Sequence, residues 1–226
     1  MKKNVMMRIA SIMLVLVLMT SSVISGTFAK YVSYDNGSDN ARVAKWGVEI
    51  EANSYNMFTD KYKLDDTAAL SFVGDYSVDS NNDDDVLAPG TSGSFADISI
   101  KGTPEVAVDV TIGATVTISD NWKVNDVYYC PIVVTVGDAQ ILGMNYNNAT
   151  DFAAAIEQAI EGKSAKYAPN TDLAGIYNNT NLDLGWSWAF STGEVNDIQD
   201  TALGNKAVTE DLTIAISLEI TVTQIN

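Results

Sequence analysis

Residue types that can perform catalysis or bind metals are unevenly represented in this sequence. The types that are absent exclude the largest number of functions. Histidine does not occur, and Cys130 is the only cysteine. Without histidine, a Ser–His or Cys–His nucleophile, the H-E-x-x-H metalloprotease motif and a His-ligated zinc site are all excluded. Cys130 lies in the apolar stretch Y-Y-C-P-I-V-V, which favours a buried and unreactive thiol. We therefore predict that the protein is not an enzyme and has no cofactor.

Carboxylates are abundant, with 29 Asp and Glu against 13 Lys and Arg, and the net charge is −16. Such a surface repels nucleic-acid phosphates, so we expect no nucleic-acid partner. The densest acidic stretch, residues 79–85, suggests calcium. An EF-hand loop requires Gly at position 6 and Glu at position 12, but counting from Asp79 these positions hold Asp84 and Gly90. A solvated loop is the preferred interpretation, with calcium as an alternative, and residues 196–201 are interpreted as a second acidic loop.

The first residues have the pattern of a secretory signal peptide. A basic start precedes a largely apolar run over residues 9–24, and small residues stand at Thr27 and Ala29. The run is interrupted by Ser and Thr and is shorter than the ~20 residues that span a bilayer. We therefore predict cleavage between Ala29 and Lys30 rather than a retained membrane anchor. The expected parts are a signal peptide (1–29), an N-terminal arm (30–42) and a β domain (43–226).

Alternation of apolar and polar residues predicts several β-strands along the domain. The expected strands are residues 43–51, 94–101, 106–119, 127–136, 182–190 and 212–222. The strand over 106–119 is the clearest, and we expect it to bend or bulge at Gly113. Because proline has no N–H, Pro131 places its strand at a sheet edge or at a bulge.

One segment changes to a helical period. Residues 149–162 predict a helix capped by Thr150, inside an excursion over about 143–181. The fold class that follows is all-β, an antiparallel jelly-roll-like β-sandwich with one short helical excursion. The in-phase side chains of Trp186, Trp188 and Phe190 are interpreted as core, with an exposed carbohydrate-stacking platform as the alternative.

Several sequence motifs together resemble a known family. They are G-T-F-A-K-Y, N-A-R-V-A-K-W-G-V-E-I, L-A-P-G-T-S-G-S-F, G-T-P-E-V-A-V-D-V, W-S-W-A-F, D-T-A-L-G and I-T-V-T-Q-I-N. This set, which covers most of the chain, resembles the TasA/camelysin family of secreted biofilm matrix fibre proteins of Gram-positive bacteria.

The resemblance implies removal of the leader after Ala29 by a SipW-type signal peptidase, and a mature protein in the extracellular matrix or on the cell surface, with no membrane attachment after cleavage. It implies a homopolymeric fibre, alone or with an accessory matrix protein, in which each N-terminus enters the next copy as a donor strand. By position, the donor strand consists of Lys30, Tyr31, Val32, Ser33, Tyr34, Asp35 and Asn36. An unpaired sheet edge accepts such a strand, and a head-to-tail contact that does not close propagates as a filament.

Two alternatives from other functional classes stay open. The first is a monomeric cell-surface module that binds carbohydrate or cations, which requires Trp186 and Trp188 to be exposed. The second is a camelysin-like surface protease. Since the chain has no histidine, only an all-carboxylate site would remain for the second.

Overall fold

The structure is a computed structural model that describes residues 42–52, 57–63, 76–82, 84–95, 98–177, 183–190 and 194–226. The chain divides into two units, Met1–Arg42 and Val43–Asn226. Of the first unit only Arg42 is described. The predicted signal peptide, the cleavage site between Ala29 and Lys30, and the predicted donor strand over residues 30–36 therefore lie outside the described residues.

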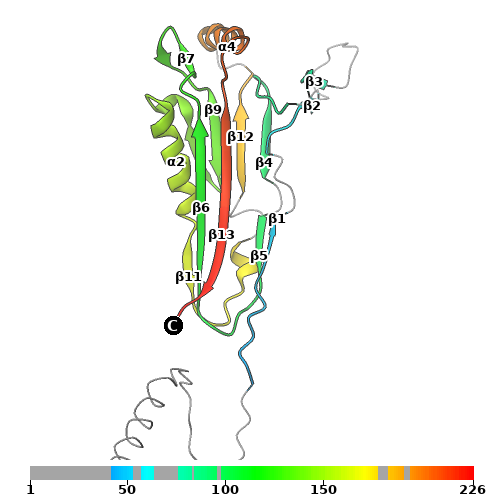
Figure 1. The fold of residues 1–226 in the computed structure, drawn as a ribbon, viewed down its shortest axis with the longest axis vertical. Helices are drawn as coiled ribbons and strands as arrows, with labels where there is room; N and C mark the ends of the chain where they lie inside the picture. Colours follow the sequence, from blue (N-terminus) through cyan, green and yellow to red (C-terminus); the bar gives the residue numbers. More distant parts are fainter. Residues whose placement is uncertain are drawn as a thin grey trace, which may run out of the picture. The chain divides into compact units, whose positions relative to one another are not determined.

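The second unit is built mainly from strands (Figure 1). The strands are β1 (Glu49–Ala52), β2 (Lys61–Lys63), β3 (Tyr76–Asp79), β4 (Ser92–Phe95), β5 (Ile98–Lys101), β6 (Val108–Ile118), β7 (Lys123–Val124), β8 (Val127–Tyr128), β9 (Ile132–Val136), β10 (Ala139–Leu142), β11 (Ala165–Tyr167), β12 (Leu184–Trp188) and β13 (Ile214–Gln224). The helices are η1 (Gly143–Asn145), α2 (Ala149–Glu161), α3 (Leu173–Ile176) and α4 (Glu194–Lys206). The strand pairs among these elements are antiparallel, so the prediction of a mainly β protein is confirmed.

Two larger sheets face each other across a shared core. One has the order β10-β9-β12-β4 and the other β11-β6-β13. Side chains from both sheets meet around one small internal space, among them Ile112 from β6, Val136 from β9 and Leu184 from β12. All three are buried. The alternation that predicted these strands is therefore the alternation between this core and solvent.

The longest ladder joins β6 to β13. Eleven residues of each strand pair, from Val108 opposite Gln224 to Ile118 opposite Ile214, without a shift of register. The predicted bulge at Gly113 is therefore wrong. Gly113 pairs with Glu219 on the outer face, where no core packing depends on a side chain, so the ladder accommodates the glycine unbroken.

Pro131 does not lie at a sheet edge. Strand β9 begins one residue after it and occupies an interior position, between β10 and β12. The expected single strand over residues 127–136 is instead two, with a break between β8 and β9 that contains the proline. The missing N–H of Pro131 therefore costs no ladder hydrogen bond.

The first predicted strand is shorter than expected. Only its end forms β1, which pairs with β5, and Gly47 just before it has a φ of +52°. Trp46 is 39 % exposed and Ile50 41 %, so the expected apolar face is not buried. The short β5 is the only strand that pairs with β1 in the described part of the chain, and it covers too little of this segment to bury it.

The helices differ from the prediction in two ways. Helix α2 is present, but its cap is Asn148, whose side chain accepts a hydrogen bond from the Asp151 N–H, and not Thr150. The expected excursion is part of the core, because α2 buries Phe152 and Ile156 and β11 pairs with β6. Residues 196–201 are not a loop but part of α4, which tertiary contacts at Asp200 and Leu203 hold against the domain.

Candidate functional site

The sheet β11-β6-β13 has one edge that is covered along most of its length. Strand β11 pairs with the first residues of β6. Beyond β11, side chains form hydrogen bonds with the backbone of β6. The Ser164 hydroxyl accepts a hydrogen bond from the Ile112 N–H at 2.8 Å and donates to the Ile112 carbonyl at 3.2 Å. The Glu157 carboxylate, from α2, accepts from the Val116 N–H at 2.8 Å. We call this side of β6 the closed edge.

The opposite side of the same sheet is different. Strand β13 pairs with β6 alone, and no other described strand pairs with its far side. We call this far side of β13 the open edge. An unpaired strand edge exposes a row of free N–H and C=O groups, which is a template for pairing with another chain.

The register identifies which groups the open edge presents. Ile112 directs its N–H and C=O to Ser164, away from β13, so its partner Ile220 is not hydrogen bonded to it. In an antiparallel ladder such pairs alternate with hydrogen-bonded ones. By this alternation every second residue of β13, from Ile214 to Gln224, directs its backbone groups to the open edge. The four within the strand are Ile216, Leu218, Ile220 and Val222.

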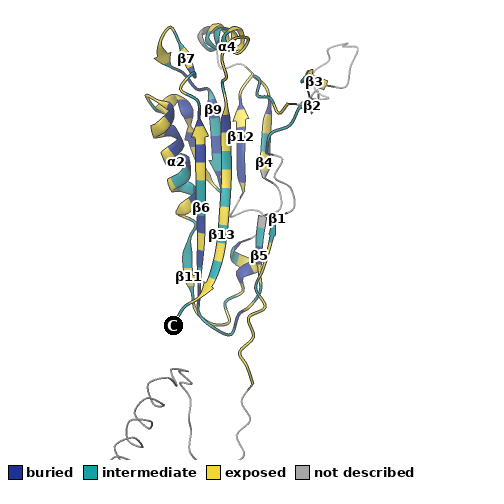
Figure 2. Cartoon of the chain, in the orientation of Figure 1, coloured by how far each residue is buried: buried dark blue, intermediate teal, exposed yellow. Residues whose placement is uncertain are grey.

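The same four residues have incomplete cover for their side chains. All four are half-buried and packed on the core, while Val108, Val110 and Ile112 of β6 are at most 1 % exposed. The intervening residues of β13, such as Ser217 and Glu219, are exposed on the outer face (Figure 2). The open edge thus combines free backbone groups with an apolar row that lacks a neighbour.

A cavity of about 590 Å³ lies at the beginning of the open edge. We call it the edge cavity. Its walls come from the start of β13, from α4 and from residues 85–89, and they include Trp122, Trp188, Leu203, Leu212, Ile214 and Ile216. The Trp122 indole N–H donates to the Thr213 carbonyl at 3.3 Å, and the Trp122 and Trp188 rings lie 5.9 Å apart. An aromatic wall therefore stands beside the first residues of β13.

Asp200 provides the buried charge of the edge cavity. It is 8 % exposed, and its two oxygens accept hydrogen bonds from the Tyr129 hydroxyl at 2.9 Å and the Trp188 indole N–H at 3.1 Å. Burial, and then the bond to Asp200, raise the pKa of Tyr129 far above its ordinary value. The phenol therefore stays a donor, and the network holds α4 against β12.

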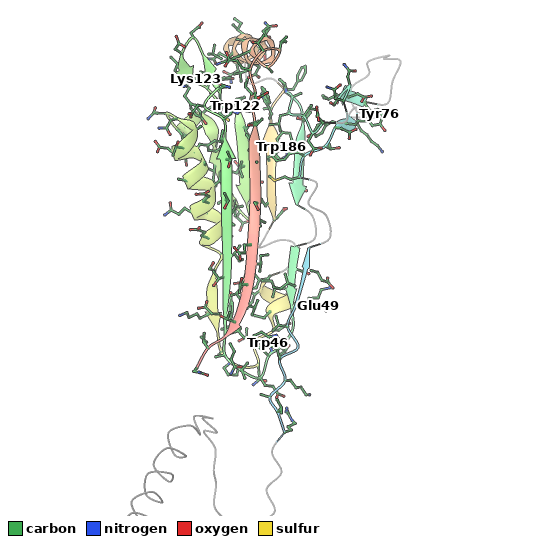
Figure 3. The ribbon with its side chains drawn as sticks, in the orientation of Figure 1. Trp46, Glu49, Tyr76, Trp122, Lys123 and Trp186 are labelled. Atoms are coloured by element: carbon green, nitrogen blue, oxygen red, sulfur yellow. The ribbon has the colours of Figure 1, made fainter. Side chains whose placement is uncertain are left out.

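The three aromatic residues near the end of β12 have different environments. Trp186 and Trp188 are 3 % and 5 % exposed, and the Trp186 indole donates to the Met57 carbonyl at 2.8 Å (Figure 3). Their interpretation as core residues is confirmed, so these two side chains form no exposed stacking platform. Phe190 is 76 % exposed, so its assignment to the core is wrong. Phe190 lies two residues beyond the end of β12, where the opposite sheet does not cover its side chain.

Cys130 is fully buried, as predicted. Burial raises the pKa of its thiol to about 12. A β-carbon placed on Gly143 would lie 3.0 Å from the Cys130 sulfur and 2.6 Å from the Cys130 carbonyl oxygen. This close packing keeps the thiol protonated and out of reach of reagents.

The described residues contain no group of three or more His, Cys, Asp or Glu side chains placed to hold a metal ion. None of the helices among them is long and apolar enough to cross a membrane. No family model, curated protein or solved structure matches this chain.

Sequence reasoning missed three features of this site: the caps Ser164 and Glu157, the buried Asp200, and the identity of β13 as an edge strand. Ser164 and Glu157 have no signal in the sequence, since polar residues within a helix and just after it are usually solvated. Asp200 lies in a polar segment that was interpreted as a loop. The long alternation of β13 predicted the strand but not its neighbours.

Proposed function

We propose that this is an exported structural protein whose copies join head-to-tail into extracellular fibres of a biofilm matrix. The open edge of β13 accepts an extended strand from the next copy. The observation that supports this most is the coincidence on Ile216, Leu218, Ile220 and Val222 of outward backbone groups and half-buried apolar side chains. Strand addition satisfies both at once, because it supplies hydrogen bonds and apolar cover together.

The donor is the segment directly behind the proposed cleavage between Ala29 and Lys30. In an extended strand Val32 and Tyr34 share one face, and Ser33 and Asp35 share the other. Val32 and Tyr34 face the core of the acceptor, since the opposite phase would bury the Asp35 carboxylate without a partner. A SipW-type signal peptidase releases the strand, which then completes a jelly-roll-like β-sandwich in the next copy.

The positions of the two ends of the domain support a head-to-tail contact. Lys45, close to where the arm joins the domain, accepts a hydrogen bond from the Glu105 N–H, and Ile225, just after β13, donates to the neighbouring Ala107 carbonyl. The arm therefore leaves near the end of β13. The edge cavity lies at the beginning of β13, and Figure 3 shows Trp46 and Trp122 at these opposite ends. A contact between unlike ends does not close on itself, so it propagates as a filament.

The decisive experiment is negative-stain electron microscopy of residues 30–226 beside residues 41–226, which lack the donor. We expect fibres from the first and monomers from the second, with tryptophan fluorescence showing that both are folded. Fibres from both proteins would show that the contact between copies does not require the arm. Monomers from both, across pH and added calcium, would reject the proposal and favour a monomeric binding module.

A matched pair of variants tests the acceptor. Leu218→Lys places a charge in the apolar row beside the incoming strand, while Ser217→Lys places the same charge on the exposed outer face. We expect Leu218→Lys to remain monomeric and Ser217→Lys to form fibres. Fibres from both variants would show that β13 is not the acceptor.

A further inference from the structure

We propose that the edge cavity is the anchoring site for one side chain of the incoming strand, Tyr34 of the neighbouring copy. This inference rests on the proposed function and adds to it the direction and the register of the donor strand.

The lining of the edge cavity selects the chemistry of its occupant. Its volume of about 590 Å³ falls within the ~300–1,000 Å³ of sites that enclose a small ligand or a large side chain. The walls are mainly apolar, with Trp122 and Trp188 among them. The polar side chains of the wall include those of Asp85, Asp200 and Thr213, and among the described residues no Lys or Arg lines the cavity. The fitting occupant is an apolar ring that carries a hydrogen-bond donor, which describes a tyrosine side chain.

Asp200 has the capacity to receive such a donor. Each of its oxygens accepts one hydrogen bond within the domain. A carboxylate oxygen has two lone pairs, so one further acceptor position remains on each oxygen. A phenol is neutral, so its entry adds no second buried charge to the cavity.

The edge cavity is continuous with the open edge. Ile214 and Ile216 both line the cavity and both direct their backbone groups outward. Ile214 is already buried, so Ile216 is the cavity residue that belongs to the half-buried row. A strand paired along the open edge therefore passes the cavity at Ile216. Whichever inward-facing side chain lies opposite Ile216 enters it.

The direction of the donor follows from the two ends of the domain. The arm leaves one copy near Val43, at the end where β13 finishes, and it reaches the next copy at the end where β13 begins. Its later residues therefore lie at the edge cavity and Lys30 lies farther along, so the donor runs antiparallel to β13. Tyr34 is the last aromatic residue before Val43, and the nine residue-to-residue steps from one to the other span at most about 30 Å.

This direction specifies the register. With Tyr34 opposite Ile216, Val32 lies opposite Leu218 and Lys30 opposite Ile220. Tyr31, the other aromatic residue of the donor, falls in the opposite phase and faces solvent. The donor thus has one aromatic anchor, and a slip of two residues would put Val32 or Asn36 at the cavity instead.

Cysteine cross-linking tests the register. In residues 30–226 we combine Tyr34→Cys with Ile216→Cys, and as the matched control Tyr34→Cys with Ile220→Cys, while the buried Cys130 is left in place. Disulfides need Cα atoms about 4.4–6.8 Å apart, and four strand residues add about 13 Å. We expect a ladder of linked copies on a non-reducing gel from the first pair and none from the second.

The outcomes separate this inference from the proposed function. A ladder from the Ile220 pair alone, or fibres without a ladder from either pair, overturns the register while strand addition stands. Because Tyr34→Cys also removes the proposed anchor, the proposed function is judged on residues 30–226 without substitutions. Absence of fibres from that folded protein overturns both.

A second pair of variants tests the cavity itself. A β-carbon on Gly204, which lines the cavity from α4, meets no atom within 4 Å, so Gly204→Phe can fill the space without a clash at the backbone. Asn205→Phe adds the same ring to an exposed neighbouring position on the helix. We expect Gly204→Phe to slow fibre growth about tenfold, the equivalent of 1.4 kcal/mol of lost anchoring, and Asn205→Phe to leave it unchanged. Equal rates from the two variants overturn the anchoring role.

Discussion

The closed edge and the open edge belong to the same three-stranded sheet, yet their surroundings differ completely. On the closed edge, β11, Ser164 and Glu157 satisfy backbone groups of β6 at residues 108–110, at Ile112 and at Val116. The side chains of Val108, Val110 and Ile112 are excluded from water. On the open edge, no described strand pairs with β13 and its apolar row is half-buried. Proteins normally protect their edge strands, since free edges promote association.

The difference shows that protection of an edge is local and depends on a few side chains. A hydroxyl and a carboxylate from α2 and the turn after it are enough to cap two backbone sites of β6. An equivalent pair of residues beside β13 would have capped backbone groups on the second edge without any further strand. Within the part of the chain that the structure describes, the open edge has no such pair. This contrast supports the proposal that β13 pairs with a strand from another copy.

The largest expected effect compares one core residue on each side. Phe152→Ala removes a fully buried ring beneath α2 and should lower the free energy of unfolding by about 3–5 kcal/mol. Leu218→Ala, on the half-buried row, should cost the monomer less than half as much. Urea denaturation of residues 41–226 measures both, and equal losses would show that the two sides are packed alike.

The next effect concerns the anchor of α4 beside the open edge. Asp200→Ala leaves the Tyr129 hydroxyl and the Trp188 indole without their acceptor, at about 1–3 kcal/mol for each group. We expect a loss of about 2–4 kcal/mol in urea denaturation, with a red-shifted tryptophan emission. Asp197→Ala, on the exposed face of the same helix, is the control and should be neutral.

A smaller effect is the pH dependence of the free energy of unfolding that comes from the buried Cys130. Burial raises the pKa of the Cys130 thiol to about 12 in the folded protein, from its ordinary value of 9.0. The unfolded chain therefore loses this proton first as the pH rises, and the stability present below pH 9 decreases above it. Between pH 8 and pH 10 the wild type should lose about 1.4 kcal/mol more than Cys130→Ala. Parallel losses for the two proteins would contradict burial of the thiol.

The smallest effect concerns the cap of the closed edge. Ser164→Ala removes the hydroxyl that bonds to both backbone groups of Ile112, and should cost about 1 kcal/mol. Ser217→Ala, on the outer face of β13, is the matched control and should stay within about 0.5 kcal/mol of wild type. If the two variants were equally stable, the hydroxyl would have no part in protecting β6.

Local alternation was sufficient to predict β6, β12 and β13, because a period of two needs no knowledge of distant residues. It failed at Phe190 and Trp46, where the strand ends or its partner is too short to bury the side chain. The four-residue β5 is one such partner. Helix α4 was missed because its sequence is polar and its support comes from Asp200 and Leu203.

The candidate site was harder to predict than the strands for the same reason. Which strand lies beside β13 depends on pairing with β6, whose partners are far away in the sequence. The caps Glu157 and Ser164 act on backbone more than forty residues away. Neither the pairing of β13 nor these caps produces a periodic pattern in the sequence. The sequence therefore predicted an arm able to pair as a strand, but not the edge that would accept it.

The ladder between β6 and β13 also has a consequence for the order of events during folding. Its partners are separated by roughly a hundred residues, so closing that loop is entropically costly, and contacts of such long range generally form slowly. The open edge does not exist until this ladder has formed, because β13 acquires its register only from β6. A partly folded copy therefore offers no place for a donor strand, and growth of a polymer would select copies that have completed folding.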